Sequence, residues 1–238
     1  MRTGLEIGMA DNPLDIGKQT KEIAEAANVG IDAVAKLGTF LDNTFGNAIK
    51  NGLGLIGDKL AYYRLERAID LQHKVEDRLK VKGINARKYV PVSFGLPILE
   101  KATVEENDEM QQLWANLLTN AMDPRYSGKI TRNFTSILPD IEPLDARILD
   151  IIVREYTSLS DEKKQNTLFI LEKLSAAIGV PLKDCENAVR NLMRLGLFKP
   201  GTVEGGMSFG EHTVSAYKDT EMFGVTGLGL DFHKAVTT

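Results

Sequence analysis

Four carboxylates lie close together near the middle of the chain, at Glu105, Glu106, Asp108 and Glu109. Pairs of carboxylates can bind a divalent cation or act as a general acid and a general base. Neighbouring residues on a helix point to different faces, however, and an acidic first turn complements the positive end of the helix dipole. We therefore expect this cluster to begin a helix rather than to form a catalytic pair.

Other motifs that carry chemistry are incomplete. The glycine pattern of dinucleotide-binding sites occurs at Gly52-x-Gly54-x-x-Gly57, but no clear strand precedes it and no βαβ unit surrounds it. The three histidines, His73, His212 and His233, are far apart and do not have the spacing of zinc ligands. The sequence has no phosphate-binding loop and no nucleophile elbow. It therefore predicts no catalytic residue, no cofactor and no metal site, and we expect the protein not to be an enzyme.

The single cysteine, Cys185, excludes an intrachain disulfide and favours the reducing cytosol. Its place on an apolar helix face predicts a buried thiol rather than a nucleophile. The first 20 residues lack the apolar core of a secretory signal, and no run of 18 apolar residues predicts a membrane span. A formal net charge of −4 is not typical of a dedicated nucleic-acid binder. We expect a cytoplasmic protein, with peripheral contact at the inner membrane as an open alternative.

A binding surface is predicted on a helix that runs from about residue 183 to residue 195 and ends at Gly196. The residues of its polar side are Lys183, Asn187, Arg190, Asn191 and Arg194. Arg and Asn can contact bases and phosphates when such a helix enters the major groove of DNA. From residue 183 to residue 199, four basic residues stand against two acidic ones, which is only weakly positive. DNA contact and a solvated face used for protein contact or packing are both open at this point.

The elements around this helix predict a winged helix-turn-helix between residues 141 and 238. A first helix is expected at Pro143, because proline suits the first position of a helix. A second helix is expected to start after Ser160 and to end before Gly179, which offers a left-handed C-cap. A short strand at Leu197-Phe198, a Gly-rich hairpin between residues 202 and 225 and a closing helix complete the pattern.

The first part of the chain has apolar and small residues that repeat every eleven residues between about residues 14 and 57. They form one nearly straight helix face, because eleven residues span three turns. The residues of this predicted arm face are Ile23, Ala27, Gly30, Val34, Gly38, Leu41, Phe45, Ile49, Gly52 and Ile56. Each glycine costs about 1 kcal/mol relative to alanine inside a helix, so we expect a contact that offsets this cost.

Three arrangements would offset it. The glycines could let another helix approach closely, within the chain or in a second copy. The face could instead lie on a lipid surface, because Lys50 is the only charge between residues 43 and 57, although lipid-binding helices usually carry more Lys and Arg. In the third arrangement, the segment forms short helices broken at its glycines. We expect this face to mediate self-association, contact with a protein partner, or contact with a membrane.

Residues 59–88 contain nine Lys or Arg against four Asp or Glu. This composition predicts either a solvated helix whose cations pair with acidic neighbours or a docking strip for phosphates or lipid headgroups. A connector between residues 89 and 95 and a helix over residues 105–122, with Trp114 on its apolar face, come next. We expect a mainly α-helical protein with a Gly/Ala-rich helical arm (1–90), a helical middle region (91–140) and a winged-helix-like domain (141–238) that includes a small β-hairpin.

Several stretches of the sequence resemble the Abi-alpha family, a bacterial family associated with abortive infection. These stretches are Ile98-Leu-Glu-Lys-Ala, Asn107-Asp-Glu-Met-Gln-Gln-Leu-Trp-Ala-Asn-Leu-Leu, Asn133-Phe-Thr-Ser-Ile-Leu, Leu144-Asp-Ala-Arg-Ile-Leu and Val225-Thr-Gly-Leu-Gly-Leu-Asp-Phe232. In the last of these, Gly227 stands where a proline or leucine is expected. The resemblance covers the chain from about residue 20 onward, and its motifs are packing signatures. It implies a bacterial or prophage protein that takes part in defence against phage, and it brings no active site to this chain.

Three functions follow from these observations, in order of expectation. The first is a non-enzymatic phage-defence protein that uses its arm for assembly or membrane association and its C-terminal domain for docking or sensing. The alternative is a winged-helix regulator that binds DNA. The third is an enzyme whose site is assembled across the fold.

Overall fold

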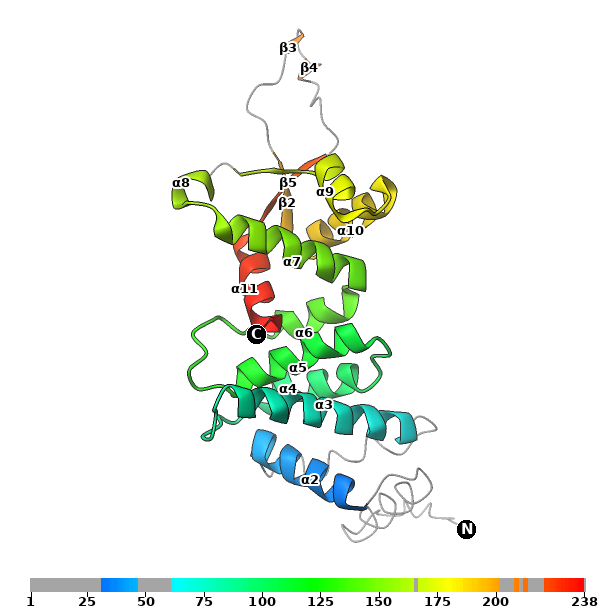
Figure 1. Ribbon diagram of the computed structural model, residues 1–238, viewed down its shortest axis with the longest axis vertical. Coiled ribbons are helices and arrows are strands. Elements are labelled where there is room, and N and C mark those ends of the chain that lie inside the picture. Colours follow the sequence, from blue (N-terminus) through cyan, green and yellow to red (C-terminus); the bar gives the residue numbers. More distant parts are fainter. Residues whose placement is uncertain are drawn as a thin grey trace, which may run out of the picture. The chain divides into compact units, whose positions relative to one another are not determined.

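The computed structural model describes residues 31–46, 61–164, 167–201, 208–209, 212–213 and 221–237. These residues are mainly α-helical with a small antiparallel sheet, as the sequence predicts (Figure 1). The chain divides into two compact units, residues 1–125 and residues 126–238. The first unit takes in the predicted arm and much of the predicted middle region.

The first unit contains four described helices. They are α2 (Ile31–Phe45), α3 (Ala61–Val81), α4 (Val92–Ala102) and α5 (Asp108–Met122). Helix α2 packs on α3 through a buried side that includes Leu37, Phe40 and Leu41. The ring of Phe45 lies against Gly95 in α4, where even a methyl group would collide with it. The absence of a side chain at Gly95 therefore allows the close approach of α2 and α4.

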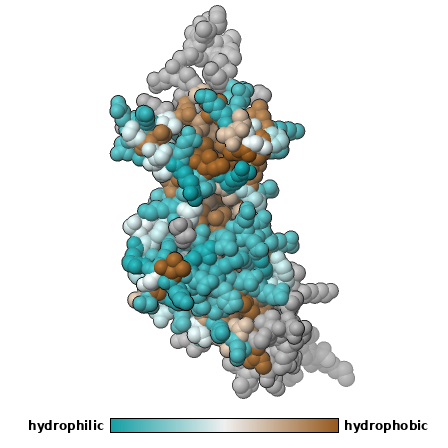
Figure 2. All heavy atoms as spheres, in the orientation of Figure 1, coloured by the Kyte–Doolittle hydropathy of each residue, from teal (hydrophilic) through white to brown (hydrophobic). Residues whose placement is uncertain are grey.

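A ladder of polar contacts joins α3 to α5. Its pairs are Arg67 with Asp108, Lys74 with Gln111, Arg78 with Asn116 and Lys82 with Asn120. The two helices are parallel, because the partners advance together along both of them. Three of the four partners are neutral amides, and Asp108 is the one carboxylate among them, which pairs with Arg67 and also lies 3.5 Å from Lys74. The surface of the first unit over α3 is largely hydrophilic (Figure 2).

The second unit begins with helices that lead into a three-stranded sheet. Its helices are α6 (Asn133–Ile137), η3 (Leu138–Asp140), α7 (Pro143–Ser158), α8 (Asp161–Lys164), α9 (Leu171–Ile178), α10 (Leu182–Arg194) and α11 (Gly227–Val236). The strands β1 (Phe169–Ile170), β2 (Phe198–Pro200) and β5 (Met222–Val225) form an antiparallel sheet in the order β1-β5-β2. Two further strands, β3 (Ser208–Phe209) and β4 (His212–Thr213), pair with each other.

One expected helix is divided in the structure. The helix predicted to begin after Ser160 and to end before Gly179 is instead the short helix α8, the strand β1 and the helix α9. The prediction was wrong there because Phe169 and Ile170 pair with Phe223 and Met222 of β5, a distant contact that overrides local helical spacing. The C-cap was correct, since Gly179 has a left-handed φ of 67°.

Aromatic side chains fill the core of the second unit. The rings of Phe198 and Phe223 stack with their centroids 5.1 Å apart, and Phe134 meets Phe232 edge to face at 5.4 Å. Cys185 is buried, as predicted, and its burial raises the pKa of the thiol. Among the described residues, no helix combines the length and the apolar character needed to cross a membrane.

Candidate functional site

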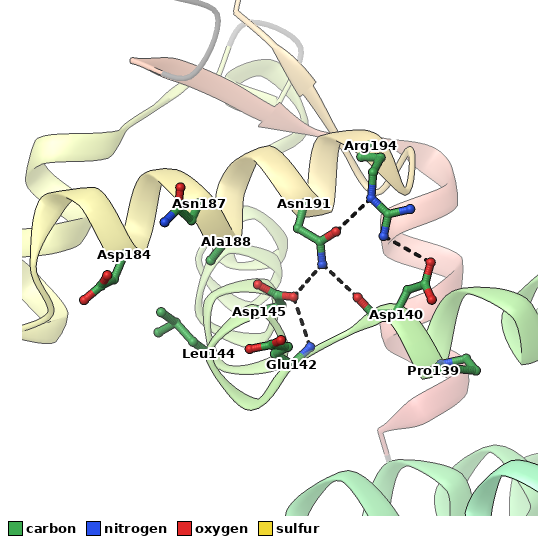
Figure 3. A pocket seen from close by; sticks show the side chains of 10 residues that line it. All are labelled: Pro139, Asp140, Glu142, Leu144, Asp145, Asp184, Asn187, Ala188, Asn191 and Arg194. Carbon is green, nitrogen blue, oxygen red and sulfur yellow. Dashed lines mark hydrogen bonds and ion pairs between the residues drawn. The ribbon is translucent and has the colours of Figure 1, made fainter.

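A hollow of about 630 Å³ opens between α10 and the corner that joins η3 to α7 (Figure 3). Its lining residues are Pro139, Asp140, Glu142, Leu144, Asp145, Asp184, Asn187, Ala188, Asn191 and Arg194. Four of these side chains are carboxylates and one is a guanidinium, so the hollow is predominantly acidic. It lies on the polar side of α10, where sequence analysis predicts a binding surface.

Helix α10 presents this polar side because its other side is anchored in the core. Ala188, Val189 and Leu192 are buried, together with Cys185. The helix begins after Pro181 and ends before Gly196, which has a left-handed φ of 74°. The end residues fix the limits of α10, and its buried residues fix which side faces outward.

Asn191 lies at the centre of a hydrogen-bond network in the hollow (Figure 3). Its Nδ2 donates to the carbonyl oxygen of Asp140 at 2.8 Å and to Oδ2 of Asp145 at 2.7 Å. Its Oδ1 accepts from Nε of Arg194 at 3.0 Å, and Nη2 of Arg194 forms an ion pair with Asp140 at 3.1 Å. Both side chains are therefore occupied by contacts within the unit.

Asp145 stabilises the first turn of α7 as well as this network. Its Oδ2 accepts a hydrogen bond from the backbone N–H of Glu142 at 3.0 Å, in the manner of a capping box. Burial raises the pKa of Asp145, although the hydrogen bonds from Glu142 and Asn191 act in the opposite direction. The carboxyl group thus holds the α7 corner against α10 from a site that is 4% exposed.

The five residues predicted for a nucleic-acid or partner face are divided by the structure. Asn187, Asn191 and Arg194 line the hollow, whereas Lys183 and Arg190 are exposed outside it. Arg190 forms an ion pair with Glu186 at 2.8 Å. The predicted face is thus split between the acidic hollow and an outer surface of α10.

The predicted arm face is described only in part. Leu41 and Phe45 are buried inside the first unit, while Val34 and Gly38 are half-exposed on α2. Ile23, Ala27, Gly30, Ile49, Gly52 and Ile56 lie outside the described residues. Half of the described part of this face is therefore used in packing within the unit.

The carboxylate cluster near residue 105 serves the contact between α3 and α5. Asp108 accepts from Arg67 at 2.8 Å and lies 3.5 Å from Lys74. The hydrogen bond from Arg67, together with the charge of Lys74, lowers the pKa of Asp108. Asn107 caps α5 by accepting from the N–H of Met110 at 3.1 Å. The cluster thus begins a helix, as predicted.

The remaining histidine and carboxylate contacts are pairwise. His233 on α11 lies 2.8 Å from Asp150 on α7, and Asp150 also accepts from Arg154. Over the residues that the structure describes, no group of three or more His, Cys, Asp or Glu side chains could hold a metal ion. The glycine motif at residues 52–57 lies outside them.

Sequence reasoning missed the carboxylates of the hollow: Asp140, Glu142, Asp145 and Asp184. The start of a helix at Pro143 could be predicted from the sequence, and an acidic residue at the third position of a helix is a local signal for a cap. Nothing local, however, indicates that this corner lies against α10. The juxtaposition depends on the packing of α10 on α7.

The chain was compared with protein families, with curated proteins and with solved structures. The family model described as abortive infection alpha matches residues 63–236, from α3 to α11. No curated protein and no solved structure gives a significant match to the chain. Because the family match spans most of the sequence, the chain belongs to the abortive infection alpha family, and its role is related to abortive infection.

Proposed function

We propose that the protein is a non-enzymatic abortive-infection protein that works by binding, and that its C-terminal unit is a winged-helix domain that docks a protein partner. The order of elements supports this proposal. Apart from the short helix α8 and the strand pair β3 and β4, the chain passes through a helix (α7), a strand (β1), two helices (α9 and α10) and two strands (β2 and β5), as in a winged helix-turn-helix. In that fold, α10 is the helix that would recognise a partner.

The observation that carries the proposal is that polar side chains of α10 are already bound to acidic residues of the same unit. Asn191 and Arg194 are already bound to Asp140 and Asp145. DNA placed on this face would bring phosphates towards four carboxylates, and binding would lose the charge neutralisation on which its affinity depends. A protein surface that offers Lys, Arg or amide donors suits these carboxylates better.

The first unit is proposed to provide self-association. Val34 and Gly38 on α2 are half-exposed, and no atom lies within 4 Å of the position that a Cβ atom on Gly38 would occupy. A helix of a second copy could approach α2 closely there, which would offset the cost of the glycine.

Phage challenge of a host that expresses the full chain tests the docking proposal. Asp184→Lys reverses one charge in the hollow, and Glu172→Lys makes the same change on the exposed side of α9 as a matched control. We expect protection to be lost with the first variant and kept with the second, while both keep the wild-type circular dichroism spectrum. Equal protection by the two variants would contradict the docking role of the hollow.

A gel shift with duplex DNA at two salt concentrations tests the alternative regulator. We expect negligible binding by the wild-type chain and by Lys183→Ala/Arg190→Ala. Binding that weakens steeply with salt and is lost in the double variant would favour the DNA-binding function instead.

A further inference from the structure

The chain that leaves α3 carries cations and exposed apolar side chains side by side. Val81 is 88% exposed and Tyr89 is 72% exposed, more than any other large hydrophobic residue that the structure describes. Lys80 and Lys88 are exposed next to them, and Arg87 is half-exposed. We name these five residues the α3-end patch. No Asp or Glu occurs anywhere between residues 78 and 99.

The backbone of this segment is held in place at several points. Gly83 ends α3 with a left-handed φ of 64°, and the N–H of Ile84 returns to the carbonyl of Leu79 at 2.8 Å. Further along, the N–H of Lys88 donates to Met122 at 3.0 Å, and that of Val90 donates to Thr44 at 2.9 Å. Ile84 and Val90 are buried. Val81 and Tyr89 are thus displayed outward by a segment that is anchored through the buried side chains of Ile84 and Val90.

The cations of the patch differ from their neighbours in the ladder. Lys82 donates to Asn120 and lies in the field of Asp123, which also pairs with Arg125. Within the described ranges, Lys80, Arg87 and Lys88 take part in none of the ion pairs. These three charges are available to an anionic partner.

We propose that the α3-end patch binds the headgroup region of a membrane that contains anionic lipids. A tyrosine ring with a polar tip suits the boundary between headgroups and acyl chains, and lysine and arginine bind the lipid phosphates. Val81 can enter the acyl boundary, whereas on nucleic acid this aliphatic side chain would have no specific partner. Two separate apolar residues between cations do not provide the roughly 800 Å² per partner that a stable protein interface requires.

The neighbouring chain supports a lipid surface over a protein surface. Gly46 lies just beyond the end of α2, and the ring of Tyr89 is 3.9 Å from the position that a Cβ atom on Gly46 would occupy. The sequence that continues from Gly46 has Lys50 as its only charge before Asp58. The sequence that follows Gly46 therefore has no acidic residue before Asp58 that would oppose an anionic surface. This surface belongs to the first unit and does not depend on the docking role proposed for α10.

Vesicle flotation of the full chain tests the proposal. Vesicles of phosphatidylcholine alone are compared with vesicles that also contain phosphatidylglycerol. We expect the wild-type chain to float only with the anionic vesicles. Lys80→Gln/Arg87→Gln/Lys88→Gln should weaken that binding about 100-fold, because each cation near an anionic surface contributes about fivefold. The matched control Lys36→Gln/Lys101→Gln/Lys129→Gln removes three exposed cations elsewhere and should bind within about fivefold of wild type.

A second variant tests the apolar contribution. Val81→Ser/Tyr89→Ser keeps all three charges and should also weaken binding to the anionic vesicles, with the loss most evident at high salt, where screening reduces the charge contribution. All variants change residues that are exposed or, at Arg87, half-exposed, so their thermal midpoints should match that of the wild type. The proposal is overturned if the wild-type chain floats with neither vesicle, or if both triple variants bind alike. Binding of duplex DNA that the α3-end triple variant loses, without any vesicle binding, would assign the patch to nucleic acid instead.

Discussion

Replacement of Asn191 by alanine is expected to destabilise the second unit by about 2 kcal/mol. Its amide donates to the buried carboxyl group of Asp145 and to the carbonyl of Asp140. A hydrogen bond to a charged group contributes about 1.5–3 kcal/mol, and water replaces the lost donor poorly at Asp145, which is only 4% exposed. The carbonyl of Asp140 lies on an exposed residue, so water can replace that bond at little cost. The loss at Asp145 therefore dominates.

The matched control is Asn187→Ala, one turn earlier on the same polar side of α10. Asn187 is exposed and also lines the hollow. Both variants exchange Asn for Ala within a helix, so the gain in helix propensity of about 0.5 kcal/mol is common to both and cancels in the comparison. We expect the control to change the free energy of unfolding by less than about 0.5 kcal/mol.

Guanidinium unfolding separates the two units with two probes. Trp114, the only tryptophan, is buried in α5 of the first unit, so its fluorescence reports that unit, whereas circular dichroism reports the helices of both. Asn191→Ala should shift part of the dichroism transition to lower guanidinium concentration, while the midpoint of the tryptophan fluorescence transition stays unchanged. Equal midpoints for Asn191→Ala and Asn187→Ala would show that the network around Asp145 does not hold α10 in solution.

Four further outcomes are expected. Gly95→Ala should destabilise the first unit by about 1–3 kcal/mol in fluorescence-monitored unfolding, because the ring of Phe45 occupies the space of the methyl group. Gly38→Ala should instead stabilise this unit by up to about 1 kcal/mol, because the space for its methyl group is open. Light scattering of the Gly38→Ala variant shows whether a second copy packs there. Burial raises the pKa of Tyr126 from 10.0 to about 12, so the contribution of this group to stability should be lost as pH rises through that interval, and Tyr126→Phe should remove this alkaline loss in ultraviolet-monitored titrations. Burial acts to raise the pKa of Asp150, but hydrogen bonds from its arginine and histidine neighbours outweigh burial and lower the pKa below 3.8. The contribution of Asp150 to stability should therefore be present above pH 3.8 and be lost as pH falls through the lowered pKa. Asp150→Asn should flatten this part of a curve of unfolding free energy against pH.

Local signals in the sequence were sufficient for several helices. The predicted helix over residues 183–195 is α10 within one residue at each end, because an amphipathic pattern coincides there with Pro181 before it and Gly196 after it. The helix with Trp114 is also present, with Asn107 as its cap. The connector expected over residues 89–95 was wrong from Val92 onward, where α4 begins. Packing of Phe94 and Gly95 in the core favours this helix start.

The candidate site was predictable on one side only. The donors Asn191 and Arg194 were visible from helical spacing, but the acceptors Asp140 and Asp145 lie about fifty residues earlier in the chain. The same limit applies to the basic helix α3. Its sequence predicted carboxylate partners or exposed cations, and Arg67 and Lys74 do pair with Asp108, but the sequence did not indicate the further Gln and Asn partners on α5. Amide side chains carry no charge pattern that a sequence could reveal.

The ladder between α3 and α5 has a consequence for the behaviour of the protein on a column. A lysine or arginine bound to neutral amides stays positively charged at neutral pH, so Arg78 and Lys82 of the ladder and the three cations of the α3-end patch give the first unit a positive surface region. The whole chain has a sequence pI of about 5.5 and would be assigned to an anion exchanger. At neutral pH and low salt it should nevertheless be retarded by a sulfonate cation-exchange resin through this one region.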